Sequence, residues 1–132
     1  MQIIRKPTKI QIANALLSKK RESAYLPNND ILIRGQKTSV EIIVKKKESM
    51  MVHNHPVIIK EEYMMIPSIE DIFLAEMYKF NRIDIVYPHS GIVRSYSFKK
   101  SGKNKTMRVI GKGVKQYSIF DYSLTAPAFQ HN

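Results

Sequence analysis

Cysteine is absent from this 132-residue chain, and so are long apolar runs. Without cysteine the chain has no disulfides, no thiolate metal ligands and no thiol nucleophile. The longest apolar runs, such as Met50-Met51-Val52, are far too short to span a bilayer. No small-residue cleavage site follows the basic residues near the N-terminus, which argues against a secretory signal. We therefore expect a cytoplasmic protein that does not enter a membrane.

Acidic residues are also scarce, because 22 Lys and Arg stand against 11 Asp and Glu and give a net charge of +11. The positive charge is clustered at Lys19-Lys20-Arg21, Lys45-Lys46-Lys47, Lys99-Lys100 and the stretch from Lys103 to Lys115. Such a field favours polyanions, for example nucleic acid or an acidic protein face. The alternative is that lysines in turns and on strand edges keep a small sheet soluble and unpaired. The clusters match no helix-turn-helix or RNA-binding motif.

What is present is the composition of one globular domain, with 43% hydrophobic and 25% charged residues. We expect this domain to cover residues 1–124. The remaining residues, 125–132, contain Pro127 and no periodic pattern, so we expect a loose C-terminal tail.

Hydrophobic periodicity predicts an α/β fold, a mixed sheet flanked by helices. Helices are expected over 7–20 and 68–80, the second with a buried face made by Ile69, Ile72, Phe73, Met77 and Phe80. Strands are expected at 24–26, 31–33, 40–44, 50–52, 83–87, 92–98, 106–110 and 114–120. Residues 56–67 carry no clear period and are expected to form a long loop.

The strongest chemical signal is the run His53-Asn54-His55-Pro56, followed by Ser68-Ile69-Glu70-Asp71. Histidines two apart on an extended chain point to the same side, because side chains alternate with a period of two. Their imidazoles can therefore share one metal ion, with Asn54 facing away. Catalytic zinc takes three protein ligands, and Asp71 on the first turn of the second helix is the natural third.

Each half of this pattern also has an ordinary structural interpretation. A His-x-His run is common on protein surfaces. Ser-x-x-Asp is a frequent helix start, in which the serine caps the helix and the acid favours the positive end of the dipole. The capping role of Ser68 is compatible with a catalytic one. The conjunction of an apolar strand, the two histidines and a capped helix that bears an acid favours the metal site.

At these residues the sequence resembles the JAMM (MPN-type) zinc metalloprotease family, most closely its RadC-like and phage-type branches. The shared features are a glutamate near the N-terminus, His-Asn-His-Pro at a strand end and Pro-Ser-x-x-Asp at a helix start. The resemblance covers roughly residues 22–98. It implies a mixed sheet between helices, in the three-layer manner of cytidine deaminases.

The resemblance also implies a zinc cofactor held by His53, His55 and Asp71. It implies that Glu22 is the general base and that Ser68 hydrogen-bonds the oxyanion of the tetrahedral intermediate. In such a mechanism zinc lowers the pKa of its bound water, Glu22 takes the proton, and the hydroxide attacks an amide carbonyl. The expected partner is a protein or peptide substrate, such as a ubiquitin-like conjugate joined by an isopeptide bond.

Two features leave alternatives open. Glu41, within the expected strand 40–44, and Glu48, expected to be exposed in a basic turn, are rivals to Glu22. The stretch from Pro56 to Pro67 is twelve residues long, longer than the family usually has at this point. Such a loop can contact substrate as a flap, which we favour, or fold across the metal site and silence it.

Two other functions compete with a zinc-dependent metalloprotease or isopeptidase. The net charge supports a DNA-associated module of RadC-like type that binds through Lys99 to Lys115. A catalytically inactive scaffold of the same fold is the third hypothesis. The presence of every motif residue argues against the scaffold, because such proteins usually lose ligands.

Overall fold

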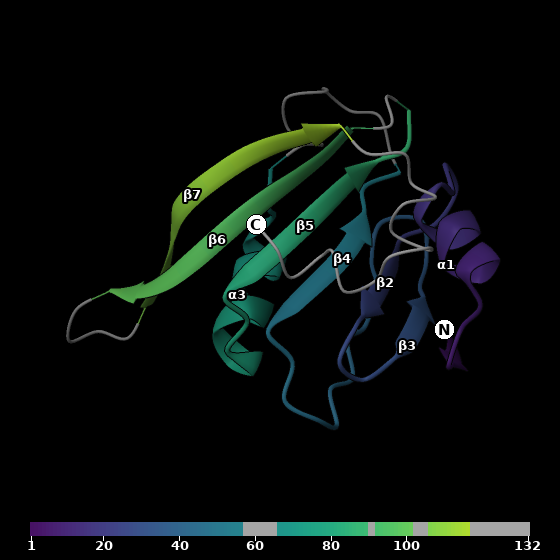
Figure 1. Cartoon of the computed structure of the whole chain (residues 1–132), viewed down its shortest axis with the longest axis horizontal. Helices are drawn as coiled ribbons and strands as arrows, with labels where there is room; N and C mark the ends of the chain where they lie inside the picture. The colour runs from purple at the N-terminus through teal and green to yellow at the C-terminus, as the bar shows by residue number, and fades with distance from the viewer. Residues whose placement is uncertain (57–65, 90–91, 102–105, 117–132) are drawn as a thin grey trace.

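The computed structural model describes residues 1–56, 66–89, 92–101 and 106–116. Within these residues seven strands form one sheet in the order β1-β3-β2-β4-β5-β6-β7 (Figure 1). The strands are β1 Gln2–Arg5, β2 Ser23–Leu26, β3 Ile31–Arg34, β4 Met50–Asn54, β5 Arg82–Tyr87, β6 Ile92–Ser101 and β7 Thr106–Gln116. The helices described are α1 Lys9–Leu16 and α3 Ile69–Tyr78. Neither is long and apolar enough to cross a membrane.

The sheet is mixed, as the sequence predicts. β4 pairs in parallel with β5, and every other pairing is antiparallel. A parallel pair needs a crossover connection, and the chain makes it through the segment that contains α3. β2 and β4 share only two paired positions, Ala24 with His53 and Tyr25 with Val52. The candidate site residues described below lie where this short pairing ends.

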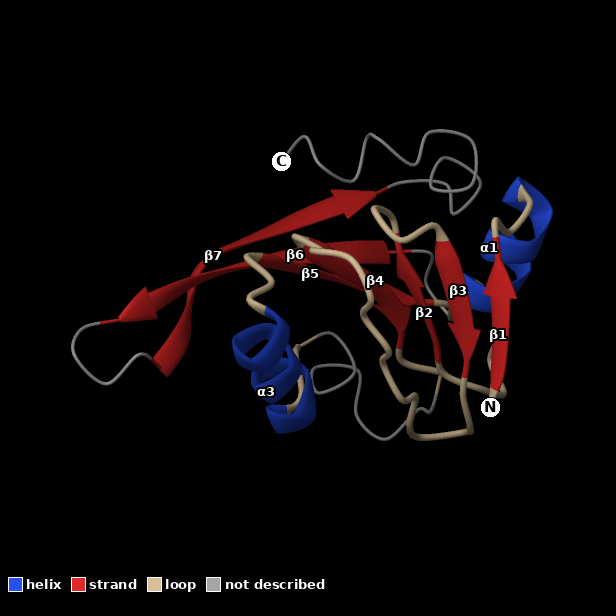
Figure 2. Cartoon of the chain, turned by 90° about the horizontal axis from the view of Figure 1, so that it is seen from below, coloured by secondary structure: helices blue, strands red, loops and turns tan. Residues whose placement is uncertain are grey.

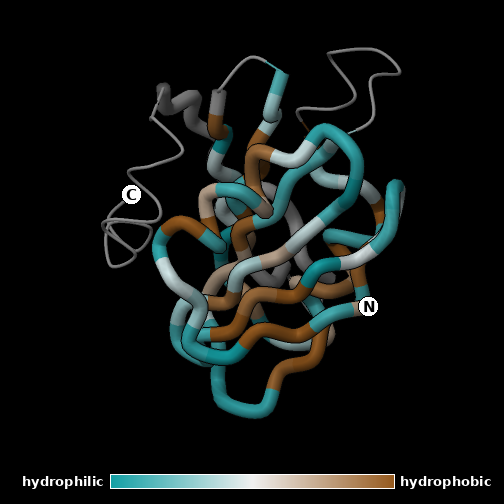
Figure 3. The backbone as a smooth tube through the Cα atoms, turned by 90° about the vertical axis from the view of Figure 1, so that its right-hand side faces the viewer, coloured by the Kyte–Doolittle hydropathy of each residue, from teal (hydrophilic) through white to brown (hydrophobic). Residues whose placement is uncertain are grey.

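The sheet separates two hydrophobic clusters, one beneath each helix (Figure 2). Successive residues of a strand face opposite sides, so β4 contributes Met50 and Val52 to the α1 side and Met51 to the α3 side. Hydrophobic and hydrophilic stretches alternate along the backbone (Figure 3). The described residues therefore form a helix-sheet-helix arrangement, and the α/β class is confirmed.

Both helices begin with a capping box. Thr8 Oγ1 accepts a hydrogen bond from the Gln11 N–H, and the side-chain oxygen of Gln11 accepts one from the Thr8 N–H. Ser68 and Asp71 make the same reciprocal pair at the start of α3. α3 ends at Lys79, which adopts a left-handed conformation with φ 59° and leads the chain into β5.

The strand predicted at residues 40–44 does not form. Both edges of β2 and both edges of β3 are already paired, so this segment does not join the sheet beside them. It instead packs Val40, Ile42 and Val44 on the α3-side cluster and leaves Ile43 exposed, and the Ile42 carbonyl accepts a hydrogen bond from the Tyr78 hydroxyl. Its alternating β-branched pattern reflects packing against a sheet face and not membership of the sheet.

Two further differences concern the edge strands of the sheet. β1 was not predicted, because a strand of only four residues has no distinctive local pattern. Thr106 to Gln116 is one strand where two were expected. Residues 57–65, most of the expected loop, lie outside the described residues, as do 117–120 and the expected tail 125–132.

α3 buries only part of the predicted face: Ile72 packs on the α3-side cluster and Phe80, just after the helix, is buried in it. Ile69, Phe73 and Met77 are 70%, 61% and 67% exposed, whereas Asp71 and Ala75 are buried. The helix carries apolar residues around most of its circumference, so the sequence offers two possible buried faces. The structure uses the one that turns Asp71 toward the sheet.

Candidate metal centre

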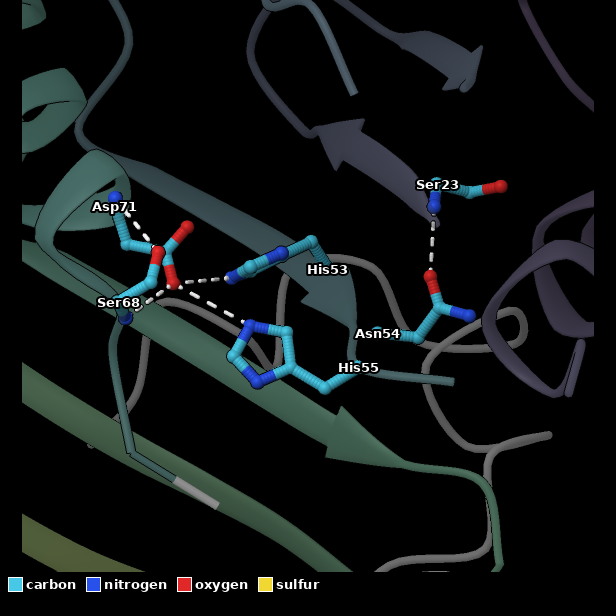
Figure 4. A network of polar contacts seen from close by, with 6 residues as sticks. All are labelled: Ser23, His53, Asn54, His55, Ser68 and Asp71. Atoms are coloured by element: carbon cyan, nitrogen blue, oxygen red, sulfur yellow. Dashed lines mark hydrogen bonds and ion pairs between the residues drawn. The ribbon is translucent and has the colours of Figure 1, made fainter. Parts of the chain in front are cut away.

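The end of β4 carries two buried histidines on one side of the sheet. His53 is 1% exposed and His55 is 6% exposed. The alternation of the strand places both on the α3 side, where Met51 also lies, and turns Asn54 the opposite way (Figure 4). The rings meet edge to face with their centroids 4.6 Å apart. A backbone bond from His55 N–H to the Val86 carbonyl, 3.0 Å, holds the second histidine against β5.

α3 supplies a carboxylate to the same point. Asp71 Oδ2 lies 3.3 Å from His53 Nε2 and 3.4 Å from His55 Nε2 (Figure 4). The same oxygen accepts a hydrogen bond from the Ser68 N–H at 2.9 Å, and Ser68 Oγ accepts one from the Asp71 N–H at 3.1 Å. The capping box therefore orients the carboxylate, as partners of metal ligands commonly do.

The three groups form a set that could hold a metal ion. One nitrogen from each histidine and one Asp71 oxygen all lie within 4.8 Å of one another. Within the described part of the chain, His53 Nε2 is buried and makes no hydrogen bond of good geometry, and the Asp71 carboxylate lies 3.3 Å from it. Buried polar atoms nearly always have hydrogen-bond partners, so a buried nitrogen that faces only this carboxylate fits a site that receives a cation.

The opposite charges in the site shift one another's pKa values toward the ionised forms. Burial alone would lower the pKa of His53, but the negative charges of Asp71 and Glu22 outweigh it, so the pKa is raised. Burial alone would raise the pKa of Asp71, but the positive charges of His53 and His55 outweigh it, so the pKa is strongly lowered. Without a metal, the carboxylate of Asp71 therefore favours the protonated form of His53, and the histidines favour the ionised form of Asp71.

Glu22 lies at the edge of this group. It immediately precedes β2 and is half-buried. Continuing the pairing of Ala24 with His53 by two residues sets Glu22 opposite His55, and its side chain shares the α3 side with Ala24. Burial raises the pKa of its carboxyl group, and the charges of His53 and His55 partly oppose this. The structure thus brings Glu22 within electrostatic reach of both histidines.

Ser68 is half-buried beside Asp71. Its hydroxyl oxygen acts as the acceptor in the capping bond. A hydroxyl also has one hydrogen to donate, and the capping bond does not use it. The structural role expected for Ser68 is confirmed, and its geometry leaves the O–H group able to donate toward the site.

The rival glutamates do not reach the site. Glu41 is exposed in a segment that is not a strand. Glu48 was expected to be exposed and is in fact 1% exposed. Its carboxylate accepts hydrogen bonds from the backbone N–H groups of Asn28 and Asn29, at 3.1 and 3.0 Å, so it holds the β2–β3 turn. Glu70 is exposed.

Two residues near the histidines have roles that sequence reasoning did not assign. His89 Nε2 lies 2.9 Å from the Pro56 carbonyl oxygen, so this histidine ties down the end of the motif. Asn54 bonds to the segment that carries Glu22. The sequence indicates only that Asn54 faces away from the metal, because its partners lie more than thirty residues earlier. His131 lies outside the described residues.

No protein-family model matches this chain, and no curated protein or solved structure shows a significant match to it. The interpretation of the site therefore depends on its own geometry and on the sequence motif.

Proposed function

We propose that this protein is a zinc-dependent hydrolase of peptide or isopeptide bonds, of the JAMM type. The observation that carries the proposal is the position of Asp71, whose Oδ2 is 3.3 and 3.4 Å from the two imidazoles. Two histidines and one carboxylate are a ligand set found in catalytic zinc sites, which leave one position for water or substrate.

The donor set favours zinc over other common ions. Magnesium and calcium prefer oxygen ligands, whereas this site offers two imidazole nitrogens and one carboxylate oxygen. Zinc accepts such mixed nitrogen and oxygen sets readily. Bound there, it would supply a Lewis acid and lower the pKa of a coordinated water toward neutrality.

The chain's own residues would carry the proton transfers. Glu22 would accept a proton from the attacking water and return it to the leaving amine as the carbon–nitrogen bond breaks. Its raised pKa suits this exchange, since a general base works best when its pKa approaches the working pH. The Ser68 O–H would donate to the oxyanion that develops on the carbonyl oxygen.

Metal analysis tests the proposal directly. We expect one zinc per chain in the purified protein and a large loss in the His53→Ala variant. Cleavage of peptides or ubiquitin-like conjugates should disappear on chelation and in Glu22→Ala, which retains all three ligands. Stoichiometric zinc with no cleavage of any such substrate would contradict the enzymatic part of the proposal.

A DNA-associated module is the second candidate, and the net charge of +11 favours it. Binding of this kind would release counterions and weaken steeply with salt, by about 10³–10⁵ between 50 and 200 mM for 6–10 phosphate contacts. We expect any such binding to involve Lys99 to Lys115. Affinity that does not depend on ionic strength, or no binding, would eliminate this candidate. An inactive scaffold of the same fold would bind neither zinc nor DNA.

A further inference from the structure

Asn54 stands between the two candidate ligands and points to the other side of the sheet. It is fully buried, and its side chain extends toward the start of β2 while His53 and His55 face Asp71 (Figure 4). The proposed hydrolysis gives this side chain no part. Its contacts nevertheless lead to the segment that carries Glu22.

The amide of Asn54 uses both of its N–H groups and its oxygen. Oδ1 accepts from the Ser23 N–H at 2.7 Å, and Nδ2 donates to the Arg21 and Ser18 carbonyls at 2.9 and 3.0 Å. All three partners are backbone groups, so they require a side chain at position 54 that offers one acceptor and two donors. An aspartate there would set an oxygen against two carbonyl oxygens, and an apolar residue would leave three groups without partners.

Two of these bonds flank Glu22 directly, one on the residue before it and one on the residue after it. The backbone of Glu22 is held from the other side as well. Its N–H donates to the Gln36 carbonyl at 2.6 Å, and its carbonyl accepts from the Gly35 N–H at 2.8 Å. The Glu22 peptide is thus clamped between the end of β3 and the side chain of Asn54.

We infer that Asn54 is a positioning residue, which fixes the Glu22 carboxylate relative to the His53, His55 and Asp71 centre. The end of one strand thereby positions both parts of the site. His53 and His55 face the metal position, and Asn54 between them holds the Glu22 segment in place. The inference rests on the proposed function, since it takes Glu22 as the group that exchanges protons. The hydrogen bonds that carry it do not depend on that role.

The test compares Asn54→Ser with Asn29→Ser as a matched control. Asn29 also ties backbone together through its amide, because its Oδ1 accepts from the Lys46 N–H and its Nδ2 donates to the Lys46 carbonyl. It follows β2, at the end remote from Ser23. We expect both variants to bind one zinc per chain. We expect kcat to fall about a hundredfold in Asn54→Ser only, the cost of a misplaced catalytic group, with KM within about twofold of the wild type.

A double-mutant cycle separates positioning from a general loss of structure. If Asn54 acts through Glu22, Asn54→Ser should lower kcat no further in a Glu22→Gln background. Equal fractional losses in both backgrounds would overturn the inference.

A second readout requires no turnover. In protein labelled with ¹³C at glutamate carboxyls, the Glu22 resonance should shift when zinc is added to the wild type and to Asn29→Ser, and much less in Asn54→Ser. If Asn54→Ser does not fold, Asn54→Gln retains the amide on a longer stem and should show the same reduced response. A full response with zinc bound would overturn the inference alone. Absence of zinc binding by the wild type would overturn the proposed function, and the inference with it.

Discussion

At the scale of single residues, one oxygen of Asp71 takes part both in the cap of α3 and in the candidate metal site. Oδ2 accepts the Ser68 N–H at the start of α3 and faces both imidazoles. The folding of the helix and the assembly of the site therefore share an atom. A substitution that keeps the hydrogen bond and removes the charge can separate these two roles.

Asp71→Asn is that substitution, because its amide oxygen can still accept the Ser68 N–H. We expect α3 to remain capped and zinc affinity to fall by more than the ~10–100-fold typical of losing an outer-shell partner. Competition with a chelator of known affinity measures the loss. Glu70→Gln is the control, since this exposed acid is on the same turn. Unchanged zinc affinity in Asp71→Asn would show that Asp71 is not a ligand.

The metal-free protein should lose stability as the pH rises above about 6.5, the ordinary pKa of histidine. A raised His53 pKa contributes stability that is complete below the unfolded value of about 6.5 and is lost as the pH rises through the folded pKa. The raised Glu22 pKa acts in the same direction at lower pH. The lowered Asp71 pKa contributes stability above about pH 4, which is lost only as the pH falls through its folded pKa.

Urea denaturation of chelated protein at pH 5.5, 7.0 and 8.5 measures this dependence. His53→Gln removes the group that titrates in this range, so its free energy of unfolding should change much less between pH 7.0 and 8.5. A wild-type stability that increased from pH 5.5 to 8.5 would contradict the raised pKa of His53.

Sequence reasoning performs unevenly at this scale. The two-residue spacing of the histidines and the helix-start signature of Asp71 are local patterns. They suffice to predict that the three side chains lie close together. Glu48 was misjudged because its neighbours are lysines, whereas its partners Asn28 and Asn29 lie about twenty residues earlier. The contacts of Asn54 were missed for the same reason. Local patterns cannot reveal partners that only the tertiary structure supplies.

At the scale of elements, α3 shows which demand sets the rotation of a helix. Its apolar residues permit more than one buried face, and the face actually buried contains Asp71 and Ala75. The polar contact between Asp71 and the histidines is compatible with only one of these faces. A prediction based on hydrophobicity alone selected Ile69, Phe73 and Met77, which are exposed, together with Ile72 and Phe80, which pack in the α3-side cluster.

The two faces of α3 should therefore respond differently to substitution. Phe73→Ser is expected to change the free energy of unfolding by no more than about 0.5 kcal/mol, as surface substitutions usually do. Ala75→Leu adds volume at a position with no exposed surface and should cost about 1–3 kcal/mol. Chemical denaturation of both variants gives the comparison. A larger loss for Phe73→Ser would show that this face is covered in solution.

Gly35, directly after β3, is a second position that cannot accommodate a larger side chain. A Cβ added there would lie 2.3 Å from the Ser39 carbonyl oxygen and 2.7 Å from Val40 Cα, so backbone would have to move. We expect Gly35→Ala to destabilise the domain by about 1–3 kcal/mol. It should also lower activity, because the Gly35 N–H holds the Glu22 carbonyl.

Denaturation and turnover of Gly35→Ala are best compared with those of Gln36→Ala, since Gln36 is exposed and contacts Glu22 through its backbone only. Equal stability of the two variants would mean that the loop at residues 36–40 can move aside without cost.

At the scale of the whole molecule, the candidate site joins the two halves of the chain that the sheet brings together. Glu22 belongs to the part before β4, His53 to β4, His55 to the residue directly after it, and Asp71 to the crossover that leads to β5. The hydrophobic pattern was enough to predict the layers, and the two clusters on either side of the sheet confirm them. Strand order was not predicted, because it depends on pairings between segments distant in sequence.

Zinc should consequently stabilise the domain against global unfolding. A ligand that binds only the folded state at 100 times its dissociation constant adds about 2.7 kcal/mol. Thermal unfolding of metal-free protein with and without added zinc should show a clear rise in Tm, with none in His53→Ala. Equal shifts in both proteins would indicate that zinc binds elsewhere.

The alternation of β4 constrains how this protein can diverge. Loss or gain of one codon inside Met50–Asn54 would exchange the two sides of the strand, turning the imidazoles toward α1 and the amide toward Asp71. The candidate ligand set and the Asn54 hydrogen bonds that hold the Glu22 segment would then be lost together, even if every one of these residues were retained. Related chains can vary in length in the segments that enter and leave this strand. Within the strand, insertions and deletions of one residue are excluded if the site is to be kept.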